Sequence, residues 1–278
     1  MSFLTVFLTP ALRNIDRPLT TDIEIVGRPR EVYTATLQLL DDVYKKKVKA
    51  MDLLIEAIRI LLLVRNENQE RMKKLLFGLE RAKGSLALSC EGIVTLVSQH
   101  LACKNSSRLP VLIVASAYQC ASTILGEFIC PLNSHTAADL QTGAIGDVEV
   151  CLVGEDNVVT AYEMKMKRVT IDDIDTALLK IAKTKPQIDN YIFITTDVIE
   201  EEVSEYASSL YEKTDGTEVA ILNCIQFLRH FLHLFHRLRI AFLDTYQDFV
   251  MKEPVSAVSQ PLKEAFLALR SAAESDYQ

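Results

Sequence analysis

The sequence lacks the short motifs that mark several large enzyme classes. Its nine glycines are scattered and form neither G-x-G-x-x-G nor G-x-x-x-x-G-K. A nucleotide-binding enzyme of the Rossmann or P-loop type is therefore disfavoured, and we expect no nucleotide cofactor. The six cysteines form no C-x-x-C pair, and most lie in apolar stretches. Buried thiols in a reducing cytoplasm are therefore favoured over a disulfide or zinc framework.

The chain also lacks an apolar run long enough to cross a membrane. Its most apolar segment, residues 50–64, is interrupted by Asp52, Glu56 and Arg59. The N-terminal stretch has no basic leader, so we expect no signal peptide. There is no repeat and no linker rich in Gly, Pro or Ser. We expect a single integrated domain over residues 1–278, in the cytoplasm and without a membrane partner.

Charge is distributed unevenly along the 278 residues. The net charge of −7 argues at first against a nucleic-acid partner. Residues 1–140, however, carry 17 Lys and Arg against 14 Asp and Glu, whereas residues 141–278 carry 13 against 23. A mildly basic first half permits a polyanion partner without requiring one.

The first part of the chain, residues 1–107, has the pattern of helices. Residues 28–84 repeat apolar positions every three or four residues, which predicts two or three helices with a break near 65–69 or 82–85. Residues 85–103 predict another helix. Residues 109–129 are apolar nearly all round and have Pro110 in the first turn, which predicts a buried helix.

The second part, residues 108–278, continues with an alternation of strands and helices after that helix. The expected strands are residues 146–153, 158–166, 190–196 and 217–223. The expected helices are residues 170–184, 197–213 and 224–251, and Thr170 with Asp173 has the spacing of a capping box. This order predicts an α/β fold with a mixed sheet covered by helices on both faces.

Three charged residues stand on the expected hairpin of residues 146–166. Glu163 and Lys165 share one face of their strand. Asp147 pairs with Glu163 if the residue numbers of opposing positions sum to 310, and with Lys165 if they sum to 312. A three- or five-residue loop gives such a register, and a four-residue loop gives it only with a β-bulge.

Two carboxylates and a lysine at one point suit metal-assisted hydrolysis of a phosphodiester. Mg²⁺ binds oxygen ligands and often takes only one or two carboxylates from the protein. The cation activates water and neutralises charge on a phosphoryl group, and a lysine orients the water or stabilises that charge. The alternative is a solvated strand end, because E-x-K is a short pattern. It occurs only once in this chain, as Glu163-Met164-Lys165.

Asp147 followed by Glu163-Met164-Lys165, on a hairpin that precedes a helix and the strand YIFITT, resembles the PD-(D/E)XK nuclease core. The surrounding segments resemble type II restriction endonucleases, in particular the SacI-type group, over roughly residues 108–250. Gly146 stands where the family often has proline. The resemblance implies a PD-(D/E)XK restriction-endonuclease-like fold with a nuclease core over residues 108–278.

The family's site residues carry over to three positions. The resemblance implies that Asp147 and Glu163 bind Mg²⁺, that the Met164 carbonyl lies near the metal, and that Lys165 is the catalytic lysine. Glu127, at the end of the preceding helix, is a candidate further ligand. The implied activity is site-specific cleavage of double-stranded DNA, and a palindromic target implies a homodimer. Two alternatives stay open: another DNA nuclease, such as a repair or phage-recombination exonuclease, and a non-enzymatic helical interaction protein.

Further residues have both a functional and a structural interpretation. Glu149 shares the face of Asp147 as an outer ligand or a solvated side chain. His135 lies in a loop that could face the site. DNA-phosphate contact is an option for Lys167, Arg168 and the run Lys45–Lys49, against simple solvation. The three-residue spacing of His230, His233 and His236 favours aromatic helix packing over zinc binding.

Overall fold

The computed structural model describes residues 15–24, 30–81, 87–132, 144–155, 157–184 and 188–275. These ranges contain helices and a five-stranded mixed sheet, which confirms the predicted α/β class. The chain forms two compact units, Met1–Glu70 and Arg71–Gln278. The single integrated domain stays a prediction. None of the helices that the structure describes combines the length and apolar character that a membrane span requires.

The first unit contains helix α1 (Arg30–Tyr44) and the start of helix α2 (Ala50–Arg81), which runs on into the second unit. The helices are separated at the lysine-rich run 45–49, where Lys46 has a positive φ of 59°. The predicted break at 65–69 is wrong, because that polar stretch contains no glycine or proline and continues the helix. The end of α2 at Arg81 agrees with the alternative break near 82–85.

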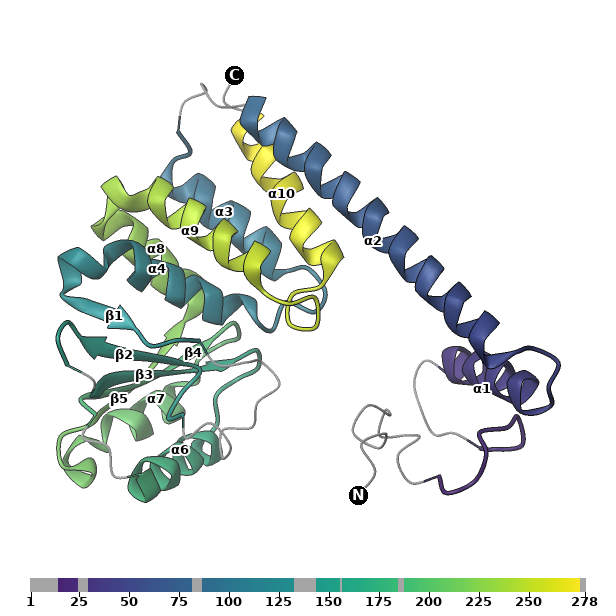
Figure 1. The fold of residues 1–278 in the computed structure, drawn as a ribbon. Helices are drawn as coiled ribbons and strands as arrows, with labels where there is room; N and C mark the ends of the chain where they lie inside the picture. Colours follow the sequence, from purple (N-terminus) through teal and green to yellow (C-terminus); the bar gives the residue numbers. More distant parts are fainter. Residues whose placement is uncertain are drawn as a thin grey trace. The chain divides into compact units, whose positions relative to one another are not determined.

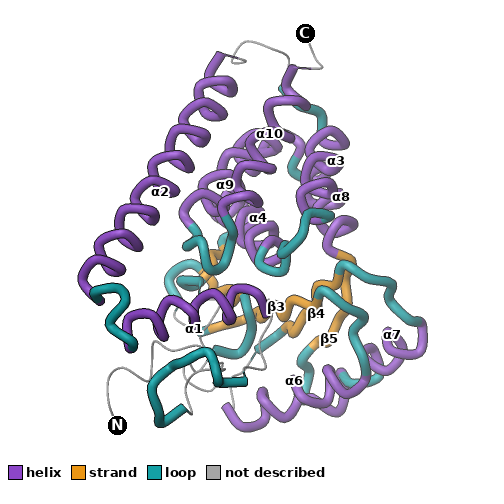
Figure 2. The backbone as a smooth tube through the Cα atoms, turned by 90° about the vertical axis from the view of Figure 1, so that its right-hand side faces the viewer, coloured by secondary structure: helices purple, strands orange, loops and turns teal. Residues whose placement is uncertain are grey.

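The second unit places the sheet between two layers of helices (Figures 1 and 2). The five helices of the larger layer are α3 (Cys90–Leu101), α4 (Leu109–Leu125), α8 (Cys224–Leu234), α9 (Arg239–Lys252) and α10 (Gln260–Ser275). The other face carries α6 (Ile171–Thr184) and α7 (Glu201–Ser208). Both faces of the sheet are therefore covered, as the strand and helix order predicts.

The sheet has the strand order β1-β2-β3-β4-β5. Its strands are β1 (Glu127–Ile129), β2 (Val148–Leu152), β3 (Val158–Lys165), β4 (Asn190–Thr195) and β5 (Glu218–Asn223). The first three are antiparallel neighbours, whereas β3, β4 and β5 are parallel. The two parallel connections contain α6 and α7, so helical crossovers account for the mixed sheet.

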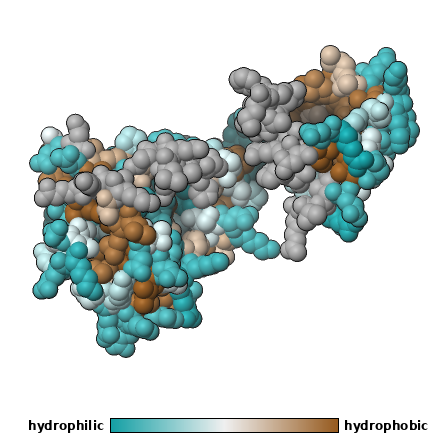
Figure 3. All heavy atoms as spheres, turned by 90° about the horizontal axis from the view of Figure 1, so that it is seen from below, coloured by the Kyte–Doolittle hydropathy of each residue, from teal (hydrophilic) through white to brown (hydrophobic). Residues whose placement is uncertain are grey.

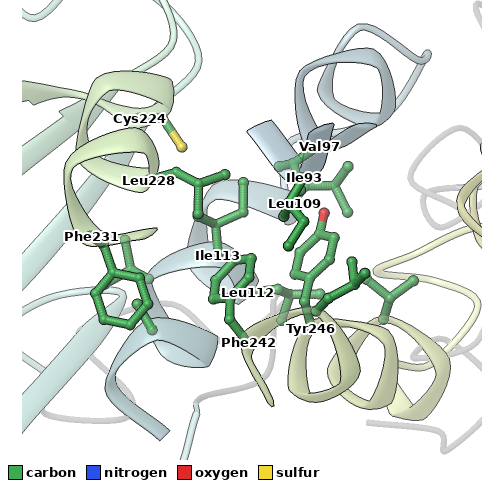
Figure 4. Packing of buried hydrophobic residues seen from close by; sticks show 14 of the residues in the cluster. Ile93, Val97, Leu109, Leu112, Ile113, Cys224, Leu228, Phe231, Phe242 and Tyr246 are labelled. Carbon is green, nitrogen blue, oxygen red and sulfur yellow. The ribbon is translucent and has the colours of Figure 1, made fainter. Parts of the chain in front are cut away.

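Each face of the sheet has its own hydrophobic core. The larger core joins Val148, Val150 and Tyr162 to the helices α3, α4, α8, α9 and α10. Figure 4 shows its centre, where Ile113 of α4, Leu228 of α8 and Phe242 of α9 come together. The smaller core packs sheet residues such as Ala161, Tyr191 and Phe193 against α6 and α7. Successive residues of β3 therefore face different cores.

Three parts of the observed fold differ from the predicted elements. The helix expected over 109–129 ends at Leu125, because Gly126 adopts a left-handed conformation (φ 71°), and its last residues form β1 instead. The helix expected over 224–251 is interrupted by Phe235 and a 3-10 turn, His236–Leu238. The helix expected over 197–213 is shorter, since α7 ends at Ser208 and a separate 3-10 turn spans Tyr211–Thr214.

Candidate functional site

The register of β2 and β3 brings Asp147, directly before β2, beside the end of β3 that carries Glu163. Val148 pairs with Tyr162, Glu149 with Ala161 and Val150 with Thr160, so the paired numbers sum to 310. Nearer the turn, Cys151 pairs with Val158, and the register shifts by one residue between Val150 and Cys151. A β-bulge therefore gives the sum of 310 for Val148–Val150, next to the charged end of the hairpin. Direct pairing of Asp147 with Glu163 stays a prediction.

Asp147 is bound to the strand that carries Glu163. Its backbone N–H donates to the Tyr162 carbonyl at 2.7 Å, and its Oδ2 accepts a hydrogen bond from the Met164 N–H at 2.8 Å. Gly146 permits this approach, since a Cβ at that position would lie 2.6 Å from the Tyr162 carbonyl oxygen. A glycine at this position thus has a steric reason.

Glu149 supports the segment before Asp147 from the same strand. Its Oε1 accepts a hydrogen bond from the Ile145 N–H at 2.6 Å. The carboxylate therefore holds the backbone two residues before Asp147. The structure thus shows Glu149 positioning this segment, and the role of outer metal ligand stays a prediction.

Lys165 lies between two carboxylates. Its Nζ is 3.5 Å from Glu163 Oε1 and 3.1 Å from Asp173 Oδ1. All three side chains are partly exposed, between 22% and 30%, so solvent and a ligand can reach them. The ammonium group thus connects the strand that carries Glu163 to the first turn of α6.

Asp173 is fixed by the capping box that the sequence predicts. Its Oδ2 accepts hydrogen bonds from the backbone N–H of Thr170 at 3.0 Å and from the Thr170 hydroxyl at 2.9 Å. The Asp173 N–H donates in return to Thr170 Oγ1 at 3.2 Å. The carboxylate that contacts Lys165 is therefore part of the N-terminal cap of a helix.

The charges of this cluster reinforce each other. Burial by itself lowers the pKa of Lys165, but the hydrogen bond to Asp173 and the charges of Glu163 and Asp173 raise it above its usual value. Burial by itself raises the pKa of Asp173, but the hydrogen bonds from Thr170 and Lys165 lower it. Lys165 is therefore a cation and Asp173 an anion at neutral pH.

Tyr191 is a site residue that sequence reasoning missed. It lies on β4 with 1% of its surface exposed, and its hydroxyl is 3.4 Å from Glu163 Oε2 and 3.3 Å from the Ile145 carbonyl oxygen. The hydroxyl proton can donate to either acceptor. A tyrosine inside a buried strand indicates that its hydroxyl donates a hydrogen bond to a nearby group, because buried tyrosine hydroxyls usually have a hydrogen-bond partner. The partner itself becomes visible only from the parallel register of β3 and β4.

The donor atoms of Asp147 and Glu163 fit a hard divalent cation. Both residues are partly exposed and supply only oxygen atoms, and Mg²⁺ often takes one or two carboxylates and completes its shell with water. Within the ranges that the structure describes, no three His, Cys, Asp or Glu side chains gather as a metal-binding group. A cation here would therefore be held by two carboxylates and not by a full protein cage.

The other candidates lie elsewhere or are already engaged. Glu127 pairs with Leu152 and alternates with Phe128 on β1, so it shares the face of Ile129 and the larger core, opposite to that of Glu163. The structure does not bring it to Asp147. Arg168 forms ion pairs with Glu200 and, at 3.9 Å, with Asp197. His135 lies outside the described residues.

The histidines and the lysine run also have structural roles. His233 Nε2 contacts Glu91 at 2.9 Å, and His230 lines a small aromatic pocket beside Phe227 and Phe231. In the lysine run, the Nζ of Lys45 lies 2.6 Å from Asp41 and that of Lys47 lies 3.0 Å from Asp42. These lysines are thus paired with carboxylates of α1, and DNA contact by them stays a prediction.

Comparisons with known proteins add no family assignment to this geometry. The chain matches no protein-family model, and it has no significant match among curated proteins.

Proposed function

We propose that the chain is a Mg²⁺-dependent endonuclease that hydrolyses phosphodiester bonds in double-stranded DNA at specific sites, in the manner of a type II restriction enzyme. The observation that carries this proposal is the placement of Asp147, Glu163 and Lys165. The Asp147 carboxylate accepts a hydrogen bond from the Met164 N–H, between Glu163 and Lys165 on β3, and Lys165 Nζ lies 3.5 Å from Glu163 Oε1. This combination of oxygen ligands and a cation suits attack of water on a phosphate.

The order of elements supports a PD-(D/E)XK fold. Helix α4 is followed by the antiparallel strands β1, β2 and β3, then by α6 and the parallel strand β4. The resemblance requires the acidic residue and the E-x-K motif on a hairpin, followed by a helix and a strand, and the chain has these elements in that order.

Each side chain has a distinct role in the proposed reaction. Asp147 and Glu163 would hold Mg²⁺, which when bound supplies positive charge beside the scissile phosphate. Lys165, kept protonated by Asp173 and Glu163, stabilises negative charge that develops on the phosphoryl oxygens and orients the attacking water. Tyr191 and Glu149 hold the backbone and the carboxylate of this site in place.

Cleavage of plasmid and phage DNA with Mg²⁺ or Mn²⁺ tests the proposal. The variants Asp147→Asn, Glu163→Gln and Lys165→Ala should each lower the cleavage rate by about a hundredfold or more. Glu155→Gln, an exposed carboxylate in the turn of the same hairpin, is the matched control and should cleave like wild type. Circular dichroism and thermal unfolding should show that all variants are folded.

The pattern of products separates the alternatives. Discrete, metal-dependent fragments support the restriction-type activity, and mapping their ends gives the target. Progressive shortening from DNA ends would instead indicate an exonuclease on the same core. If folded wild-type protein cleaves no DNA with either metal, the proposal is wrong and a non-enzymatic interaction protein is favoured.

A further inference from the structure

Two cysteines from different strands bring their sulfur atoms together. Cys130 follows the last residue of β1, and its N–H donates to the Glu149 carbonyl at 2.8 Å, so the pairing with β2 continues past Ile129. Cys151 is two residues further along β2 and shares the same face. The two Sγ atoms are 2.9 Å apart. The thiols are therefore already within reach of each other.

One of the two thiols can be approached from solvent. Cys130 is half-buried and lines a pocket of about 420 Å³ together with Gln119, Lys252 and Glu253. The Glu253 carboxylate is paired with Arg108 at 3.0 Å, whereas the ammonium of Lys252 is largely exposed and 3.7 Å from Asp248. Cys151 has only 1% of its surface exposed. The pair thus consists of an accessible thiol and a buried one.

The remaining cysteines lack this arrangement. Each of Cys90, Cys103 and Cys120 has its thiol within hydrogen-bonding distance of a backbone carbonyl. Burial raises the pKa of Cys120 to about 11 and that of Cys224 to about 12, so both remain protonated and unreactive at neutral pH.

We propose that Cys130 and Cys151 are a redox-active pair that closes a reversible disulfide with a small-molecule disulfide such as oxidised glutathione. The Cys130 thiolate attacks one sulfur of glutathione disulfide, which forms a mixed disulfide and releases one glutathione thiolate. The Cys151 thiolate then attacks the Cys130 sulfur and releases the second glutathione. Two cysteine thiols are oxidised, one glutathione disulfide is reduced to two thiols, and the cysteine protons pass to the leaving thiolates.

The disulfide would reinforce the edge of the sheet next to the candidate site. It would join the end of β1 to β2, across from Glu149, whose side chain holds the segment before Asp147. The two cysteines are 21 positions apart in the sequence, and a crosslink of this kind restricts the unfolded chain. Oxidation should therefore raise the midpoint of thermal unfolding, and dithiothreitol should reverse the increase.

The test exposes the full native chain to a series of reduced and oxidised glutathione ratios. After acid quenching and alkylation, intact mass should show two thiols lost together, and peptide mapping should find Cys130 joined to Cys151. Cys151→Ser should stop at one glutathione on Cys130, and Cys130→Ser should remain largely unmodified. Cys120→Ser is the control and should still lose two thiols.

Three outcomes would overturn the proposal. They are a crosslink between other cysteines, a stable glutathione adduct without a disulfide in wild type, and a disulfide that forms only under denaturing conditions. The readout is covalent mass and not DNA cleavage. A negative result would therefore reject the redox proposal and leave the nuclease proposal unaffected.

Discussion

At the scale of single residues, Asp173 has the most specific expected effect on the proposed activity. Asp173→Asn keeps an oxygen that can accept from Thr170 but loses the charge that raises the pKa of Lys165. We expect cleavage to fall about 10- to 100-fold, by analogy with other groups that orient a site residue. Because the pKa of Lys165 should fall, the alkaline limb of the pH–rate profile should move to lower pH.

Asp172→Asn is the matched control for this change. Asp172 lies in the same first turn of α6 and is exposed, so its loss should leave both rate and pH profile unchanged. If Asp173→Asn destabilises the chain but leaves the alkaline limb in place, Asp173 only caps the helix.

His100 makes the stability of the fold depend on pH. It is fully buried, its Nε2–H donates to the Leu262 carbonyl at 3.0 Å, and its Nδ1 accepts from the Tyr246 hydroxyl at 3.0 Å. Burial lowers its pKa from 6.5 to about 4, so between these values the unfolded chain binds more protons. Stability is therefore fully present above pH 6.5 and is lost as the pH falls toward 4, by about 3 kcal/mol.

Urea unfolding between pH 7 and pH 4.5 measures this loss. His100→Gln removes the titrating group and should flatten the acid limb, although it lowers stability at pH 7. His233→Gln changes an exposed histidine and should keep the full acid dependence. An unchanged acid limb in His100→Gln would contradict the assignment.

At the scale of elements, Gly146 determines how closely β2 approaches β3. In Gly146→Ala the new Cβ would lie 2.6 Å from the Tyr162 carbonyl, a backbone atom that cannot move alone. We expect a loss of about 1–3 kcal/mol in the free energy of unfolding, typical of overpacking, together with weaker cleavage because Asp147 is displaced. Urea unfolding and the DNA cleavage assay measure the two effects.

Gly78→Ala provides the comparison within a helix. The nearest neighbour of a Cβ at Gly78 in α2 would be Ser271 Oγ at 4.0 Å, and alanine favours the helix by up to about 1 kcal/mol. A neutral or stabilising effect at both glycines would show that the strands tolerate the extra carbon.

The elements that sequence predicts best are those with a strong local signal. The alternation in β2 and β3, the capping box of α6 and the apolar α4 with Pro110 need no knowledge of the rest of the chain. Strand β1 has only three residues and follows a glycine, so its own sequence is a weak signal. It forms by pairing with β2. The break at Phe235 likewise has no glycine or proline to announce it.

The candidate site likewise has some features that the sequence predicts and others that it does not. Sequence predicts Glu163 and Lys165 on one face, and Asp147 opposite Glu163 for one class of register. The sum of 310 for Val148–Val150 depends on a bulge, a one-residue shift between Val150 and Cys151, that no local pattern predicts. Tyr191 and the contact of Asp173 with Lys165 depend on how β4 and α6 pack against β3, which no local pattern specifies.

At the scale of the whole molecule, α2 presents an apolar surface within the first unit. Nine large side chains are each between 44% and 68% exposed: Met51, Leu54, Ile55, Ile58, Ile60, Leu61, Leu62, Leu63 and Val64. Apolar side chains at the surface are brown in Figure 3. Exposed apolar side chains gathered on one element in this number mark an interaction surface.

A second copy of the chain is the expected partner for this surface. Residues 30–70 contain seven basic and seven acidic residues, so the segment has no net charge that would oppose association with itself. We therefore expect a homodimer, as the proposed activity on a palindromic target also requires. Sedimentation velocity over a range of concentrations should show a dimer that dissociates on dilution.

The double variant Ile58→Glu, Leu61→Glu places two charges on one face of α2, because residues three apart are neighbours on a helix. It should shift the chain to a monomer over the whole concentration range. Asn66→Glu with Gln69→Glu adds the same charge at the same spacing to exposed polar positions and should leave the dimer intact. If wild-type protein is monomeric throughout, the homodimer prediction is wrong. If both double variants dissociate the dimer equally, added charge and not the loss of apolar contact is responsible.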